Sequence, residues 1–172
     1  MSEKKMHALT ELLLKNLDLA FDKKAWHGPT LKGALRGIGP KEALWRPSPR
    51  HHNIWELTLH AAYWKYIVRR TLTADKGQSF PRQPSNWPTT AVKGDGLNWR
   101  RDQTLLKDWH GRLREAVEHF PPDRLYRKPS GSKVIYLDMI VGAAAHDLYH
   151  AGQIQLLKRL MRGGVVKTGK RT

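Results

Sequence analysis

The segment that decides the fold is LDMIVGAAAHDLYHAGQIQLLKRLM, which spans residues 137–161. Its apolar side chains recur at spacings of three and four, which places them on one face of an α-helix. They are Met139, Ile140, Ala143, Leu148, Ile154, Leu157 and Leu160. Gly163 and Gly164 follow, and glycine favours the end of a helix. The segment therefore predicts a helix from about Leu137 to Met161.

Three more long helices are predicted from the rest of the chain. Residues 3–22 carry apolar side chains at helical spacing, and residues 97–119 do the same before Pro121 and Pro122. Between them, Asn53 and Glu56 form a capping-box pattern ahead of a helix that is apolar over much of its surface. Such a helix sits well inside a protein. Pro29 is a suitable first residue for a short additional helix through Leu35.

The segment 75–96 separates the second and third long helices. It is too rich in helix breakers to be helical, and a loop of this length is usually functional or disordered. The breakers are Gly77, Pro81, Pro84, Pro88, Gly94 and Gly96. No segment alternates apolar and polar residues as a half-buried strand does. We therefore predict an all-α fold of four principal helices, a single domain over residues 1–162, and a basic, flexible tail over residues 163–172.

The composition narrows the classes of partner. The chain has no cysteine, which excludes disulfides, thiolate ligands and a thiol nucleophile. Lys and Arg number 31 against 15 Asp and Glu, a formal net charge of +16, which attracts anions. These basic residues are scattered, so a solvated basic surface is favoured over nucleic-acid binding. We find no signal peptide and no apolar run of roughly 20 residues, so we expect a cytoplasmic protein with no membrane partner.

Three histidines are the strongest candidates for chemistry. His146 and His150 lie four residues apart in the last helix, so their rings can converge on one metal ion. A zinc peptidase would need Glu directly after the first His, and Asp147 stands there instead. His60 is the best third ligand, because an unpaired ring would be costly to bury in its apolar helix. Three such ligands leave a coordination position open for water or substrate.

A plainer interpretation of the same histidines stays open. A buried histidine is more often satisfied by a carbonyl or hydroxyl group than by a metal ion, and a pair four residues apart on an exposed helix face is usually inert. The spacing alone does not decide between these alternatives.

Four stretches of the sequence carry a family resemblance. They are Trp26-His-Gly-Pro29, His52-Asn-Ile-Trp-Glu-Leu-Thr-Leu-His60, Asn98-Trp-Arg100, and Leu137-Asp-Met-Ile140 running into His146-Asp-Leu-Tyr-His-Ala-Gly-Gln-Ile154. They span most of residues 8–160. With them, the chain resembles the DinB/YfiT-like superfamily of small metal-binding four-helix bundles.

The resemblance implies an up-down-down-up bundle, with the long loop between helices two and three, and a homodimer. It also implies one divalent metal ion, nickel or zinc by preference and manganese or iron as other options, bound by His60, His146 and His150. Two positions depart from the family pattern. Asn53 replaces a common Ser, and Tyr136 replaces a common Thr or Ser cap, which leaves the start of the last helix open.

The remaining candidates have weaker assignments. Gln153 shares a helix face with the two histidines and is either a hydrogen-bond donor to them or a packing residue. Asp147 either orients an imidazole of a neighbouring helix or pairs with a surface Lys or Arg. Trp87 is expected to cover the mouth of the metal site. Three tryptophans are interpreted as core residues, and five histidines are interpreted as structural or exposed. They are Trp26, Trp55 and Trp64, and His7, His27, His51, His110 and His119.

Three functions compete at this point, and whether the chain is an enzyme stays open. The first is a metal-dependent enzyme, either a transferase that uses a small thiol cosubstrate or a hydrolase, acting on a small and preferably anionic molecule. The resemblance implies this chemistry but no substrate. The second is a non-catalytic stress-response or binding module with a structural or vestigial metal. The third, nucleic-acid binding, rests on charge alone and ranks last. No catalytic residue can be named, because Asp147 and Tyr149 point at no clear target.

Overall fold

The computed structural model describes residues 7–75, 77–90 and 95–163, and every regular element in these ranges is a helix. The all-α prediction is therefore confirmed. The long helices are α1 (Ala8–Phe21), α4 (Ile54–Thr73), α5 (Gly96–Glu118) and α6 (Tyr136–Gly163). The short ones are α2 (Leu31–Ala34), α3 (Pro40–Leu44) and the 3-10 helix η1 (Pro122–Arg124). No helix in this part of the chain combines the length and apolar character needed to cross a bilayer.

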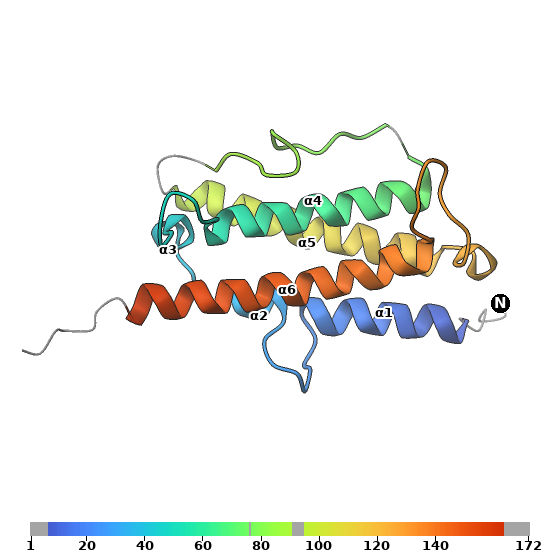
Figure 1. The fold of residues 1–172 in the computed structure, drawn as a ribbon, viewed down its shortest axis with the longest axis horizontal. Helices are drawn as coiled ribbons and strands as arrows, with labels where there is room; N and C mark the ends of the chain where they lie inside the picture. The colour runs from blue at the N-terminus through green and yellow to red at the C-terminus, as the bar shows by residue number, and fades with distance from the viewer. Residues whose placement is uncertain (1–6, 76, 91–94, 164–172) are drawn as a thin grey trace, which may run out of the picture.

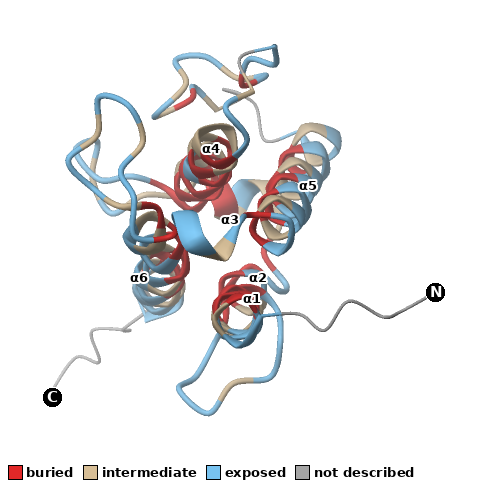
Figure 2. Ribbon diagram, turned by 90° about the vertical axis from the view of Figure 1, so that its right-hand side faces the viewer, coloured by how far each residue is buried: buried red, intermediate tan, exposed pale blue. Residues whose placement is uncertain are grey.

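The four long helices pack side by side, and each contacts two of the others. Helix α4 packs against α5 and α6, and α1 packs against the same two helices. The colours of Figure 1 show that α1 and α6 run in one direction while α4 and α5 run in the other. The end view of Figure 2 shows the buried faces of the long helices turned toward the interior.

The helix starts show how local sequence sets the element boundaries. The capping box predicted for α4 is present, because Asn53 Oδ1 accepts from the Glu56 N–H at 2.8 Å and Glu56 Oε2 accepts from the Asn53 N–H at 3.1 Å. The short helix predicted to begin at Pro29 and run through Leu35 begins at Leu31 and ends at Ala34. Thr30 is its cap, and the Thr30 hydroxyl accepts from the Gly33 N–H at 3.1 Å. Residues 3–6 of the first predicted helix and residues 164–172 of the predicted tail lie outside the described residues.

The connection from α4 to α5 crosses the length of the bundle. Because the two helices run in the same direction, the chain must return from the end of α4 to the start of α5, about 30 Å for a 20-residue helix. Its described residues are packed down at several points. Phe80 is buried, Tyr66 donates to the Gln78 carbonyl at 3.0 Å, and Arg82 pairs with Asp102 on α5. The connection therefore runs over α4 as an anchored segment.

The three tryptophans expected in the core have different environments. Trp55 is fully buried, as the sequence predicted, and its Nε1 donates to Asp102 at 2.7 Å. The core prediction is wrong for Trp64, which is 39% exposed and lies beside His60 and His146. The prediction for Trp26 is wrong, because its side chain is 97% exposed. It lies in the connection between α1 and α2, which offers no helix face that would bury it.

A buried polar layer divides the core into two apolar clusters. One cluster holds residues from the first half of α4, and the other holds Val68 and Leu72 from its second half. His110 and Asp147 lie between the two clusters in sequence on α5 and α6, and Lys65 lies one residue before Tyr66, the last α4 member of the first cluster. All three polar side chains are buried. Helix α1 contributes Phe21, whose ring stacks on His110 at 3.8 Å between centroids and lies 5.1 Å from Lys65 Nζ.

His110 is held in its neutral form by this layer. Burial, reinforced by the cations Lys65, Arg114 and Lys32, lowers its pKa from 6.5 to about 3. Its Nδ1 has no hydrogen-bond partner among the described residues. The structural role expected for His110 is thus found in the interior.

We expect the substitution His110→Phe to reduce the acid sensitivity of the fold. Between pH 6.5 and about 3 the unfolded state binds a proton at His110 that the folded state excludes, so this residue lowers stability as the pH falls through that window. Phenylalanine keeps the stack on Phe21 without titrating. Urea unfolding gives the free energy of unfolding at pH 7 and at pH 5. The decrease between the two pH values should be about 2 kcal/mol smaller in the variant than in the wild type. His27→Phe, at an exposed position, is the control. Equal losses in wild type and His110→Phe would contradict the assignment.

Candidate metal centre

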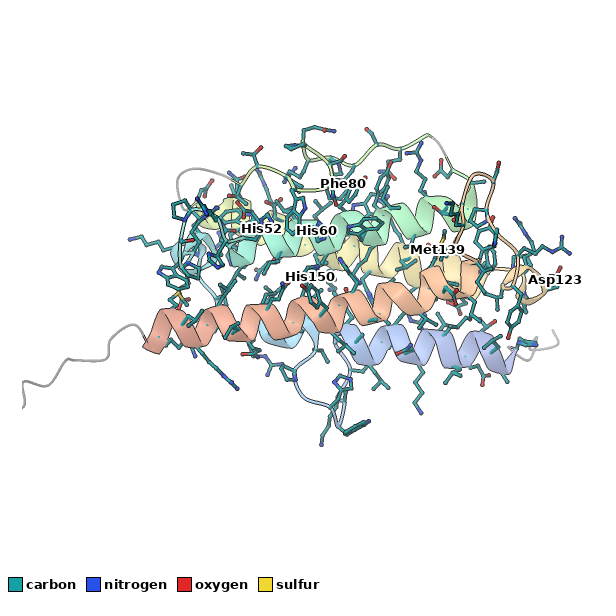
Figure 3. All side chains as sticks on the ribbon, in the orientation of Figure 1. His52, His60, Phe80, Asp123, Met139 and His150 are labelled. Carbon is teal, nitrogen blue, oxygen red and sulfur yellow. The ribbon has the colours of Figure 1, made fainter. Side chains whose placement is uncertain are left out.

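Three histidine side chains from two helices converge on one point. His60 comes from the middle of α4, and His146 and His150 come from successive turns of α6. His146 Nε2 lies 3.3 Å from His60 Nε2 and 2.9 Å from His150 Nε2, and one nitrogen of each ring lies within 4.8 Å of the others. Figure 3 shows His60 and His150 facing each other across the two helices. The structure thus brings together the three residues that sequence reasoning selected.

Hydrogen bonds fix the orientation of two of the three rings. His60 Nδ1 lies 2.8 Å from the Asn86 carbonyl oxygen, and His150 Nδ1 lies 2.6 Å from Gln153 Oε1. Both oxygens can only accept, so each Nδ1 carries a proton. In the neutral ring the lone pair is then on Nε2, the nitrogen that faces the shared point.

Burial keeps the three imidazoles neutral. It lowers the pKa of His60 from 6.5, that of His146 to about 3 and that of His150 to about 4. The proximity of the rings adds to this effect, since protonation of one ring disfavours protonation of the next. Metal ligation requires the neutral form, which is therefore present at pH 7.

The donor set fits a divalent transition-metal ion. Two ligands bound at about 2.0–2.1 Å to a tetrahedral ion lie about 3.3 Å apart, close to the observed nitrogen separations. A single proton on His146 Nε2 can bridge only one of the two neighbouring lone pairs, whereas a cation among the three nitrogens satisfies all of them. Imidazole ligands suit zinc, nickel, copper and iron.

A cavity of about 430 Å³ opens onto the three rings. Its mouth carries the basic and polar residues Arg50, His51 and His52, and its wall includes Tyr149 and Gln153. The apolar part of its lining is formed by Leu57, Trp87, Leu156 and Leu157. A volume of this size accommodates a small organic molecule.

Trp87 covers His60 from the crossing connection, as expected from the sequence. Its ring stacks on His60 with a centroid distance of 3.8 Å and an interplanar angle of 7°. On its other side His52 stacks at 3.6 Å and 3°. His52 Nδ1 in turn lies 3.1 Å from Glu56 Oε2. The stack of His52, Trp87 and His60 joins the connection to α4 next to the histidine cluster.

Asp147 and Lys65 form a buried ion pair beneath the histidines. Lys65 Nζ lies 2.5 Å from Asp147 Oδ2, and both side chains are almost fully buried. Burial raises the pKa of Asp147, and the Lys65 ammonium opposes this rise. Both expectations for Asp147, an imidazole partner or a surface cation, are therefore wrong. The reason is that Asp147 lies on the buried face of α6 that packs against α4, where it meets Lys65.

The sequence missed several residues around the site. Gln153 contacts His150 as expected, but its amide oxygen accepts the hydrogen bond, so it does not act as a donor. Asn86 offered no signal, because its contribution is a backbone carbonyl. Arg50, His51 and His52 form a basic run just before the cap of α4, which could have marked the mouth. His51 was assigned no role, yet it lines the cavity.

Comparisons with known proteins give one match. A family model described as the DinB superfamily matches residues 25–154, a range that covers more than half of the chain and contains all three histidines. The searches of curated proteins and of solved structures found no match.

The ion pair beneath the site generates a stability prediction. Lys65→Met leaves a buried carboxylate without its cation, and we expect a loss of about 3–5 kcal/mol. Asp147→Leu should cost a similar amount by leaving the ammonium unpaired. The double variant Lys65→Met/Asp147→Leu should lose much less than the sum, because it buries no unpaired charge. Urea unfolding at pH 7 measures this coupling, and additive losses would show that the two charges do not stabilise each other.

Proposed function

The chain belongs to the DinB superfamily, and we propose that it binds one divalent metal ion through His60, His146 and His150 and uses it in a reaction on a small molecule. The observation that carries the proposal is the convergence of three Nε2 atoms whose rings are neutral and, for His60 and His150, oriented by acceptors at Nδ1. Such partners at the second ring nitrogen are typical of metal-ligating histidines. Nickel and zinc are the preferred ions.

The cavity favours an enzyme over a structural metal site. Structural sites close the coordination shell with a fourth protein ligand, whereas catalytic sites leave a position open. The described residues offer three clustered ligands, and a cavity of about 430 Å³ lies at the remaining side. A divalent ion there would lower the pKa of a water or thiol at the open position. Since the chain has no cysteine, a thiol must come from a cosubstrate.

The residues that line the cavity supply groups for substrate binding and for acid–base chemistry. Arg50 at the mouth attracts an anionic group of the substrate, and Leu156, Leu157 and Trp87 receive its apolar part. The described lining contains no Asp or Glu, so an acid–base group must be an imidazole or a phenol. His52 is the best candidate, because Glu56 orients its Nδ1 and leaves Nε2 free to accept a proton. Hydrolysis and transfer of a small thiol are the two reactions that this arrangement suits.

The alternative function is a non-catalytic binding module with a structural or vestigial metal. It predicts that chelation unfolds the protein without affecting any reaction. Two further expectations accompany the proposal and stay predictions, as does the cytoplasmic location. One is a four-helix bundle of the up-down-down-up type, and the other is a homodimer.

Metal content tests the proposal most directly. Protein purified without a His-tag should hold about one equivalent of nickel, zinc, manganese or iron by mass spectrometry, because three neutral imidazoles bind such ions at pH 7. His60→Ala/His146→Ala should lose the metal. His27→Ala/His119→Ala removes two exposed histidines and should keep it. If the wild type takes up no ion even after reconstitution near pH 8, the metal-dependent function is wrong and the binding-module alternative ranks first.

A second panel of variants separates metal binding from turnover. Gln153→Leu removes the acceptor at His150 Nδ1 and should weaken metal affinity about tenfold, measured by competition with a chelator. Gln155→Leu makes the same change two residues away on α6 and should have no effect. His52→Asn should leave the affinity unchanged and lower only the rate with substrates found by screening hydrolysis and thiol transfer. Equal metal affinity in Gln153→Leu and Gln155→Leu would contradict the orienting role of Gln153.

A further inference from the structure

A second cavity, of about 590 Å³, lies away from the metal centre. It is enclosed by the end of α1, the segment 30–38 that contains α2, and the first half of α5. None of the residues that line it also lines the cavity at the histidines. The DinB-type metal site therefore leaves this cavity without an assigned role.

Cationic side chains surround this second cavity. Lys32 and Arg36 come from one wall, and Arg100 and Lys107, seven residues apart on the same face of α5, come from the other. Asp22 is the one carboxylate of the described lining, and it pairs with Lys32 at 3.2 Å. Arg36, Arg100 and Lys107 have no carboxylate within 4.0 Å in the part of the chain that the structure describes. Gathered positive charge of this kind raises the local concentration of anions.

The floor of the cavity is apolar. It is formed by Phe21, Leu35, Ile38 and Leu106, each of which is at least 94% buried in the bundle core. These side chains are fixed by the packing beneath them, and the small part of each that faces the cavity is apolar. An apolar floor with a few charged groups is the composition of a small-molecule site.

The wall that carries Arg36 is held in place from the opposite side. Lys158 on α6 donates from Nζ to the Ala34 carbonyl at 2.9 Å and to the Arg36 carbonyl at 3.2 Å. The Thr30 hydroxyl fixes the start of the same segment by accepting from the Gly33 N–H. The cavity is therefore formed before a ligand arrives, which lowers the entropic cost of binding.

We propose that this cavity binds a small organic phosphate. Arg36, Arg100 and Lys107 contact the phosphate oxygens, and the apolar body of the ligand packs on Phe21, Leu35, Ile38 and Leu106. A phosphate monoester fits better than a carboxylate, because its two negative charges and three terminal oxygens match several cations at once. The proposal is independent of the metal centre.

The experiment uses the full chain with phenyl phosphate as the probe, and inorganic phosphate and benzoate as comparison ligands, in 150 mM NaCl. Calorimetry should show tighter binding of phenyl phosphate than of either comparison ligand. Amide chemical shifts on addition of the probe should move at Gly33, Gly37 and Thr104, which line or adjoin the cavity. Shifts confined to residues around His150 would place the probe at the metal centre and overturn the proposal.

A matched pair of double variants separates a site from general attraction by a +16 chain. Arg36→Gln/Arg100→Gln removes two exposed rim cations and should weaken phenyl phosphate binding at least tenfold. Lys128→Gln/Lys133→Gln removes the same charge at exposed positions outside the cavity. This variant should change the affinity for phenyl phosphate less than twofold. Equal weakening in both variants, or binding of inorganic phosphate as tight as that of phenyl phosphate, would overturn the proposal. The wild-type shifts decide the question even if a variant fails to fold.

Discussion

The rest of the structure depends on the buried ion pair between Lys65 on α4 and Asp147 on α6. A buried charge must meet its partner at hydrogen-bond distance, so the pair allows only one register between the two helices. That register is also the one that places His60, five residues before Lys65, against His146 and His150 on either side of Asp147. The constraint that organises the core thus also assembles the site.

The direction of the helices supplies the second part of the site. Because α4 and α5 run the same way, their connection must cross the molecule, and in Figure 1 it runs along α4 on the side opposite to α6. Arg82 and Phe80 hold it down, and Asn86 and Trp87 then reach His60. A short connection between antiparallel helices would have left His60 without its backbone acceptor and without its aromatic cover. The connection is therefore both a consequence of the helix directions and a component of the candidate metal centre.

The sequence predicted what depends on periodicity and spacing, and the family resemblance drawn from it is confirmed. The long helices, the Asn53 cap and the pairing of His146 with His150 follow from residues that act locally or on one helix face, whereas His60 was added from its apolar helix and from the family resemblance. The metal itself stays a proposal. What could not be predicted depends on contacts between distant segments: the Asn86 carbonyl at His60, the pairing of Asp147 with Lys65, and the exposure of Trp26. Every residue has a backbone carbonyl, so the role of the Asn86 carbonyl leaves no mark in the sequence. The partner of Asp147 and the lack of packing around Trp26 both depend on other segments, which a helical pattern does not reveal.

The acceptors at His60 and His150 differ in how easily a substitution removes them. His150 relies on the side chain of Gln153, which one codon change can remove, while His60 relies on the main chain of Asn86. Substitution at residue 86 replaces the side chain and leaves the carbonyl oxygen in place. As long as the loop keeps its backbone path, a substitution at residue 86 does not remove the acceptor of His60. Side chains of the loop next to the cavity can therefore change without loss of the carbonyl that orients His60.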